Sequence, residues 1–311
     1  MSLVRALAVS LRPHQWIKNL VVFAALGFSK HLFDRDAAAR AALAVLVFCG
    51  LASAVYLVND LIDAERDRLH PAKRLRPIAS GALPAGIART AALMLFAFAL
   101  AGSLALGMPF LLCALAYSVL GLAYSLLLKH VVILDVLTIA IGFVLRGVAG
   151  AVVIGVHFSP WLVVCTLLLA LFLALAKRRH EIVSLDDAAG HRASLAEYSP
   201  YLLDQMIAVV TASCLTAYSF YTLAPETVEK YRTERLALTI PFVIYGLFRY
   251  LYLVHRHDQG GSPGDVLLTD RPLLATVTLW ALAMVLIVYT AAVMAEAVSY
   301  THLTLPTICS V

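Results

Sequence analysis

An apolar run passes directly into a row of carboxylates in the stretch Ser53-Ala54-Val55-Tyr56-Leu57-Val58-Asn59-Asp60-Leu61-Ile62-Asp63-Ala64-Glu65-Arg66-Asp67. The apolar part belongs to segment 39–61, which is long enough for a membrane-spanning helix of about 20 mostly apolar residues. Carboxylates at the boundary of a bilayer are energetically unfavourable, so they are interpreted as functional by default. The stretch therefore predicts a membrane helix that ends in a polar site.

The composition of the whole chain also indicates a membrane protein. Of its 311 residues, 62% are hydrophobic and only 14% are charged, whereas a soluble domain carries about 25% charged residues. One soluble core cannot cover this much apolar surface, so lipid is the expected solvent. The net charge of +5 is small, and basic residues concentrate in cytoplasmic loops of membrane proteins. We therefore expect no nucleic-acid partner.

Nine segments are long and apolar enough to cross a bilayer. Their apolar runs are continuous rather than alternating, which favours helices over a β-barrel. We therefore expect an all-α polytopic membrane protein with nine transmembrane helices. The first is the weakest, because Lys18, Asn19 and Lys30 interrupt it. The nine expected spans are 17–34, 39–61, 87–107, 109–128, 131–155, 160–177, 205–224, 237–255 and 273–295.

The placement of Lys and Arg predicts the orientation of these spans. With the N-terminus in the cytoplasm, the basic loops 62–86 and 178–204 fall on the inner side, as the positive-inside rule requires. The third long polar loop, 256–272, falls on the same side. We therefore expect a multi-pass protein of the inner (plasma) membrane whose active site faces the cytoplasm.

The sequence predicts one transmembrane domain, 1–297, followed by a tail, 298–311. The tail continues neither the apolar pattern of a spanning helix nor a basic cytoplasmic end, and it looks unlike native sequence. We expect this tail to be unstructured, and we assign it no function.

The acidic row has the geometry of a metal site if the helix continues through it. At ~100° per residue, Asp60, Asp63 and Asp67 project within roughly 60° of one another, with Asn59 at the edge. Their mutual repulsion, and that of the helix C-terminus, would be relieved by a cation. Magnesium prefers carboxylate oxygens and keeps sites open for phosphates. We predict that the three aspartates are catalytic metal ligands; the alternative is a solvated helix end.

A basic group follows the acidic row at once. Arg side chains match phosphate oxygens in a bidentate manner, so we interpret Arg66, Lys73, Arg74 and Arg76 as contacts to a phosphate-bearing ligand. The strongest candidates are Lys73 and Arg76, and Arg68 is assigned to topology. The positive-inside pattern alone also explains the group, and both interpretations can hold together.

Polar residues in or beside other spans extend the candidate site. Arg146 lies in the middle of span 131–155, where it either pairs with a buried carboxylate such as Asp135 or binds a phosphate. At the end of span 160–177 lies the cluster Lys177-Arg178-Arg179-His180-Glu181. It is either a cytoplasmic flank or a second metal or phosphate site. The other candidates for substrate binding are Asn59, Tyr124, Lys129, Lys177, Arg178 and Glu181.

The motif Asn59-Asp60-x-x-Asp63-x-x-x-Asp67, followed by Lys73 and Arg76-Pro77-Ile78-Ala79-Ser80-Gly81, resembles the first Asp-rich motif and basic tail of the UbiA superfamily of intramembrane prenyltransferases. The resemblance covers nearly the whole chain and implies nine helices around a central cavity. The chain departs from the family's second Asp-rich motif, because the matching place reads Lys177-Arg178-Arg179-His180-Glu181 and then Asp186-Asp187. This basic cluster suits a substrate with an additional phosphate.

A narrower resemblance is carried by Leu11-Arg12-Pro13-His14-Gln15-Trp16-Ile17-Lys18-Asn19, by His70-Pro71-x-Lys73-Arg74-x-Arg76-Pro77 and by Gly264-Asp265-Val266-x-Leu268-x-Asp270-Arg271. These are similar to the subgroup that transfers ribose 5-phosphate from phosphoribosyl diphosphate to a polyprenyl phosphate such as decaprenyl phosphate. The resemblance implies Mg2+ dependence, release of diphosphate and a role in precursors of cell-wall or envelope glycans. It implies that Lys18, Lys73, Arg76, Lys177 and Arg178 hold phosphates and that Arg146 guides the lipid head.

Two other functions stay open. The same magnesium site could ionise a polyprenyl diphosphate for transfer to an aromatic acceptor, as in UbiA-type prenyltransferases. A more remote alternative is a transporter of an anionic solute, with Arg146 and the aspartates as its binding site. The sequence also leaves a homo-oligomer open and says nothing about polyprenyl chain length.

Overall fold

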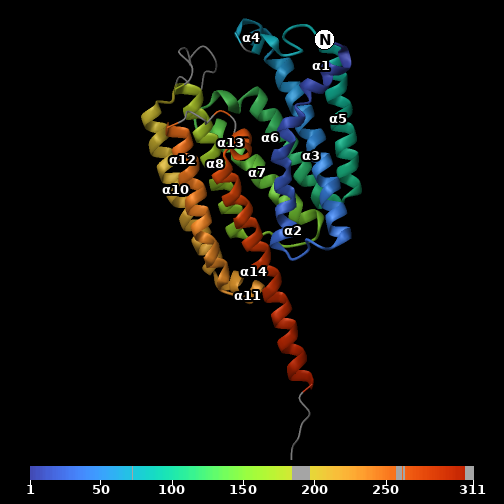
Figure 1. Cartoon of the computed structure of the whole chain (residues 1–311). Helices are drawn as coiled ribbons and strands as arrows, with labels where there is room; N and C mark the ends of the chain where they lie inside the picture. Colours follow the sequence, from blue (N-terminus) through green and yellow to red (C-terminus); the bar gives the residue numbers. More distant parts are fainter. Residues whose placement is uncertain (72, 184–196, 257–260, 262, 305–311) are drawn as a thin grey trace, which may run out of the picture.

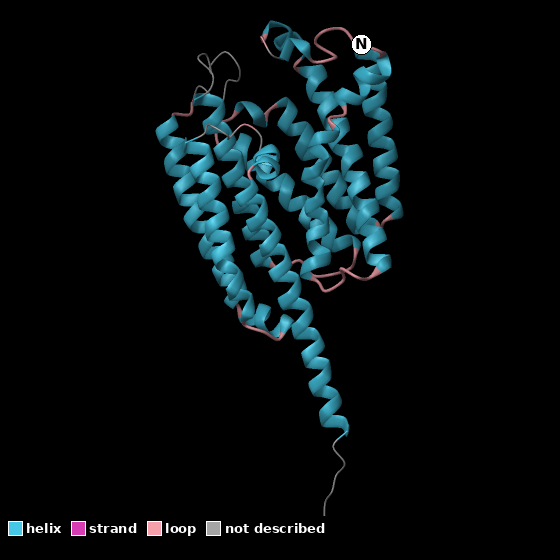
Figure 2. Ribbon diagram, in the orientation of Figure 1, coloured by secondary structure: helices cyan, strands magenta, loops and turns pink. Residues whose placement is uncertain are grey.

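The computed structural model describes residues 1–71, 73–183, 197–256, 261 and 263–304, with only the backbone for 291–304. Every regular element in these ranges is helical, which confirms the all-α class (Figure 2). The elements are α1 (Leu3–Ser10), η1 (Pro13–Phe23), α2 (Ala24–Phe28), α3 (Arg35–Ile62), α4 (Ala64–Leu69), η2 (Lys73–Leu75), α5 (Ala85–Ala105), α6 (Met108–Leu126), η3 (Leu128–His130), α7 (Leu134–Val153), α8 (Pro160–Val183), α10 (Pro200–Leu223), α11 (Pro225–Tyr231), η4 (Arg235–Thr239), α12 (Ile240–Arg256), α13 (Pro263–Thr269) and α14 (Arg271–Thr304).

Eight helical stretches in the described residues are long and apolar enough to cross a membrane. They correspond to the second to ninth expected spans: α3, α5, α6, α7, α8, α10, η4 with α12, and α14. Figure 1 shows these helices side by side in one bundle. Within the bundle α7 contacts α3, α6, α8 and η1, so it joins the N-terminal helices to the C-terminal ones.

The first expected span is not a continuous α-helix, so the count of nine such helices is not confirmed. Its residues form the 3₁₀ helix η1 and the short helix α2, which run along the bundle in Figure 1. Eleven residues at a rise of ~2.0 Å and five at ~1.5 Å reach about 30 Å, the thickness of a hydrocarbon core. The segment is therefore long enough to cross a hydrocarbon core with few residues.

Close packing against α7 holds η1 in place. A Cβ atom at Gly150 would lie 2.1 Å from the carbonyl oxygen of Val22, so only glycine permits this approach. At the same level Asn19 is fully buried and accepts a hydrogen bond from Arg146 Nε at 2.8 Å. Asn19, one of the polar residues that weaken this segment as a spanning helix, is therefore turned toward protein rather than lipid.

The two ends of the bundle differ in character. One end carries α1, α4, the C-terminal end of α8 and α13, whereas α2 and α11 lie at the other end (Figure 1). The described parts of the three long polar loops thus share one face, as the sequence predicts. The backbone of α14 continues as a helix to Thr304, where we expected no regular structure from 298 onward. Residues 305–311 lie outside the described residues.

Candidate active site

A cavity of ≈ 520 Å³ lies among η1, α3, α6, α7 and α8. Its wall contains Asp63 and most of the residues predicted to bind substrate. Arg66 and Arg74 are exposed and lie outside this wall. The predicted residues that line the cavity are Lys18, Asn59, Lys73, Arg76, Tyr124, Arg146, Lys177, Arg178 and Glu181.

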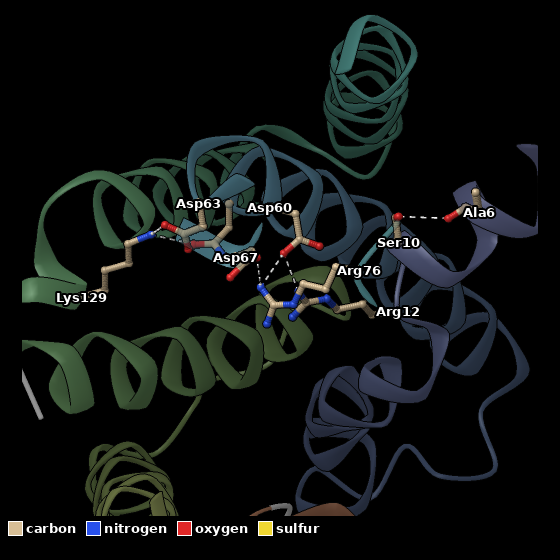
Figure 3. Close-up of polar contacts among 9 residues, drawn as sticks. Ala6, Ser10, Arg12, Asp60, Asp63, Asp67, Arg76 and Lys129 are labelled. Atoms are coloured by element: carbon tan, nitrogen blue, oxygen red, sulfur yellow. Dashed lines mark hydrogen bonds and ion pairs between the residues drawn. The ribbon is translucent and has the colours of Figure 1, made fainter. Parts of the chain in front are cut away.

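The acidic motif bends in the middle, which corrects the expectation of one continuous helix. Helix α3 ends at Ile62, and Asp63, at φ −88° and ψ −1°, ends α3 and precedes α4. The Asp63 N–H still donates to the Asn59 carbonyl at 2.9 Å. Asp60 and Asp67 both accept from Arg76, whereas Asp63 accepts from Lys129 (Figure 3).

Two arginines neutralise the buried pair of aspartates. Asp60 is 3% exposed, and its Oδ1 accepts from Arg12 at 2.6 Å and from Arg76 at 3.1 Å. Arg76 also donates to Asp67 Oδ2 at 2.7 Å. Figure 3 shows both guanidinium groups directed at these carboxylates from outside α3. The basic loop therefore folds back onto the acidic row that precedes it in sequence.

Lys129 is bound by the other oxygens of the motif. Its ammonium lies 2.6 Å from Asp63 Oδ1 and 3.2 Å from Asn59 Oδ1. Among the described residues no group of three His, Cys, Asp or Glu side chains is arranged to hold a metal. The donor chemistry nevertheless fits a divalent cation, because hard oxygens from two side chains already converge on a positive charge. A metal bound here would take the place of the Lys129 ammonium.

The basic cluster of α8 is anchored by an acidic residue of α7. Arg178 Nε donates to Asp135 Oδ2 at 2.8 Å, and both side chains are buried. Arg178 also pairs with Glu181 and donates to the Tyr124 hydroxyl at 3.4 Å. The alternative in which Asp135 pairs with Arg146 is therefore wrong. Asp186 and Asp187 of the same cluster lie outside the described residues.

Arg146 has neutral partners. It donates to Asn19 Oδ1 at 2.8 Å, to the Tyr117 hydroxyl at 2.7 Å and to the Gly142 carbonyl at 3.0 Å. In the described part of the chain no carboxylate lies within ion-pair distance of Arg146 or of Lys18, which also lines the cavity. This part of the wall therefore has positive charge available for an anionic ligand.

Sequence reasoning assigned no role to three residues that the structure places in the site. Arg12 precedes α3 by many residues, and a basic residue near the N-terminus is what membrane topology alone predicts. Tyr117 lies in an apolar span and resembles a packing residue. Asp135 was considered only as a partner of Arg146. Their roles depend on how the helices pack, and the only signal in the sequence was that Arg12 belongs to a motif shared with the resembling subgroup.

We expect Arg76→Gln to lower the stability of the folded protein by about 2 kcal/mol, because two buried carboxylates lose a shared partner. Reversible unfolding in SDS, followed by tryptophan fluorescence, measures the change. The control is Arg68→Gln, which removes one hydrogen bond to the Ala79 carbonyl and an exposed pair with Glu65 that contributes less than about 1 kcal/mol. Equal stability of the two variants would contradict the bridging role of Arg76.

A bundle of helices long and apolar enough to cross a membrane, with a cavity lined by carboxylates and cations, defines an integral membrane protein with a charged cavity. Residues 19–263 match the UbiA prenyltransferase family, and the chain belongs to this family.

Curated relatives and solved structures agree with this assignment. The decaprenyl-phosphate phosphoribosyltransferase of Corynebacterium glutamicum is 35% identical over 90% of this chain and 86% of its own length. The protein of the same name from Mycolicibacterium smegmatis is 33% identical over 90% of this chain and 91% of its own. A UbiA homologue from Archaeoglobus fulgidus, solved bound to GPP and Mg2+, has the same fold, with a TM-score of 0.71 at 20% identity over 91% of this chain and 99% of that one.

Proposed function

We propose that this protein transfers a 5-phosphoribosyl group from phosphoribosyl diphosphate to a polyprenyl phosphate such as decaprenyl phosphate, with Mg2+ and with release of diphosphate. The site would face the cytoplasm from the plasma membrane, and the product would be a precursor of cell-wall or envelope glycans. The observation that carries the proposal is a single cavity whose wall has two different parts. One part contains Asp63 and Asn59, and the other contains Arg146 and Lys18, which have no carboxylate partner in the described residues. The names of the relatives over nearly the whole chain support the same reaction.

The acidic part of the wall suits the diphosphate of the donor. Asn59 and Asp63 would supply oxygens for magnesium. Asp60 and Asp67, the other two aspartates predicted as metal ligands, bond to Arg76 in this structure. Bound magnesium would neutralise charge on the diphosphate as its bond to ribose breaks. Lys73 and Arg76 line the same cavity and would contact the remaining phosphate oxygens.

The transfer needs positioning and electrostatic stabilisation more than proton transfer. The bond from ribose C1 to the diphosphate oxygen breaks, and its electron pair leaves with the diphosphate. An oxygen of the polyprenyl phosphate forms the new bond to C1. Because that oxygen is already anionic, no side chain has to remove a proton from it. The chain's contribution is to hold two anions near one carbon atom, and the cations on the cavity wall do this.

The part of the wall without carboxylates suits the phosphate of the acceptor. Arg146 and Lys18 have no acidic partner in the described residues, so a phosphate would not compete with a carboxylate there. We expect Arg146→Gln to raise the KM for polyprenyl phosphate by at least about ten-fold, the loss typical of a hydrogen bond to a charged group. The KM for phosphoribosyl diphosphate should change much less, and initial rates with each substrate varied in turn measure both. Equal effects on the two values would remove the acceptor assignment.

The direct test uses purified protein in detergent or nanodiscs, with phosphoribosyl diphosphate labelled in the ribose, a polyprenyl phosphate and Mg2+. We expect a labelled lipid that contains ribose phosphate, together with one equivalent of diphosphate. A parallel reaction supplies a polyprenyl diphosphate and an aromatic acid. Turnover in that reaction alone would replace the proposal with aromatic prenyl transfer, the other reaction that the acidic site could support.

A further inference from the structure

The link between α6 and α7 contains a strained turn. Ile133 has φ +70° and ψ −46°, and the Leu134 N–H donates to the Val132 carbonyl at 2.8 Å. This is a γ-turn with positive φ at its centre, a rare and strained form, and a β-branched residue makes it more unfavourable. Such a conformation persists only where surrounding contacts hold it, and it is found preferentially at functional sites.

Tyr198, which lies just before α10, makes the contacts that hold this turn. Its hydroxyl accepts from the Ile133 N–H at 2.7 Å and donates to Asp135 Oδ1 at 2.8 Å. The side chain is buried, and burial raises the pKa of Tyr198, so the hydroxyl keeps the proton that it donates. One hydroxyl therefore ties the centre of the turn to the first residues of α7.

The turn stands between two cations of the candidate active site. Four residues before Ile133, Lys129 binds Asp63 and Asn59. Two residues after it, Asp135 binds Arg178, which lines the cavity. A relaxed backbone at Ile133 would change the distance and direction between Lys129 and Asp135, and so between the Lys129 ammonium and the Arg178 guanidinium that Asp135 holds.

We propose that Tyr198 is a positioning residue, which sets the Lys129 ammonium and the Arg178 guanidinium relative to one another, where both can meet oxygens of a metal-bound diphosphate, by holding the turn at Ile133. It contacts no reacting group itself. The affinity of the cavity for a metal-bound diphosphate therefore depends on a hydroxyl outside the cavity wall. The inference rests on the proposed function only in taking diphosphate as the ligand.

The test compares Tyr198→Phe with wild-type protein, because phenylalanine keeps the buried ring and removes both hydrogen bonds. We expect faster amide hydrogen exchange in residues 128–135, where Ile133 loses its acceptor. We also expect magnesium diphosphate, titrated by calorimetry, to bind about ten-fold more weakly, the loss typical of a buried group left without its partner. Neither measurement requires phosphoribosyl transfer. The role of Tyr198 can therefore be tested even if the transfer assay of the proposed function fails.

The matched control is Tyr218→Phe. Tyr218 is also buried and bonds through its hydroxyl to Thr239 and Trp280, away from the cavity. We expect this variant to bind magnesium diphosphate as the wild type does. Equal losses in the two variants, or unchanged exchange in Tyr198→Phe, would overturn the proposal.

A second variant tests the turn itself. Glycine adopts positive φ without strain, so Ile133→Gly should bind magnesium diphosphate normally and should restore part of the affinity lost in Tyr198→Phe. A double variant no better than Tyr198→Phe would contradict a role through the turn. If Tyr198→Phe does not fold, the double variant is compared with Ile133→Gly alone. If wild-type protein does not bind magnesium diphosphate, the proposed function fails, and the exchange measurement decides the role of Tyr198 alone.

Discussion

Replacing Asp63 with asparagine is expected to lower the kcat of the proposed transfer at least ~100-fold, the usual loss when one group that stabilises the transition state is removed. Asp63 is the aspartate of the motif that lines the cavity, and among the described residues it forms an ion pair with one cation, Lys129. Asparagine keeps the shape of the side chain but removes the charge that would hold magnesium. The labelled-lipid assay, run across a range of Mg2+ concentrations, measures the loss.

The matched control for Asp63→Asn is Glu65→Gln, two residues further along the same motif. The Glu65 side chain is 83% exposed, and its one ion pair in the described part of the chain is with Arg68 at the surface. We expect this variant to keep near wild-type turnover. Full activity in Asp63→Asn, or an equal loss in Glu65→Gln, would show that the acidic row does not hold the metal.

The second large effect is structural. Gly150→Ala would place a methyl group 2.1 Å from the Val22 carbonyl oxygen, a contact that only a backbone shift can relieve. We expect a loss of stability of about 3 kcal/mol or more, the upper range for inserting a methyl group into a packed interior. Thermal unfolding in detergent, with size-exclusion chromatography to detect aggregation, measures it.

Gly142→Ala on the same helix is the control for this substitution. A Cβ atom there would meet Arg146 Nη1 at 3.6 Å, an ordinary contact. We expect this variant to unfold at nearly the wild-type temperature. If Gly150→Ala were as stable as Gly142→Ala, η1 would have room to move away from α7, and the close approach would not be a requirement of the fold.

The sequence was sufficient for the features that depend on local pattern. The apolar run before Asn59 and the carboxylates after it predicted α3 and the position of the polar site. The helix break at Asp63 could not be predicted, because spacing alone favours a continuous helix. The 3₁₀ winding of η1 was also hidden, since hydropathy counts apolar residues and does not distinguish 3₁₀ from α winding.

The pairing of charged residues could be learned only from the three-dimensional structure. Arg146 and Asp135 lie on one helix and looked like partners, yet Asp135 bonds to Arg178 of α8 and Arg146 bonds to neutral groups. In the same way, Arg76 reaches the aspartates while Arg66, which is closer in sequence, is exposed. Helix packing decided these pairs, and the positions along the chain contained no signal for it.

The placement of Lys129 makes ligand binding at the acidic motif a process of ion exchange. Its ammonium already lies against Asp63 and Asn59, so under the proposed function a free divalent cation would have to displace it, and two positive charges would then lie close together in a buried site. A metal that arrives with a diphosphate would bring negative charge with it, and the displaced ammonium could turn to a phosphate oxygen. We therefore expect the motif to bind the metal–substrate complex in preference to the bare ion.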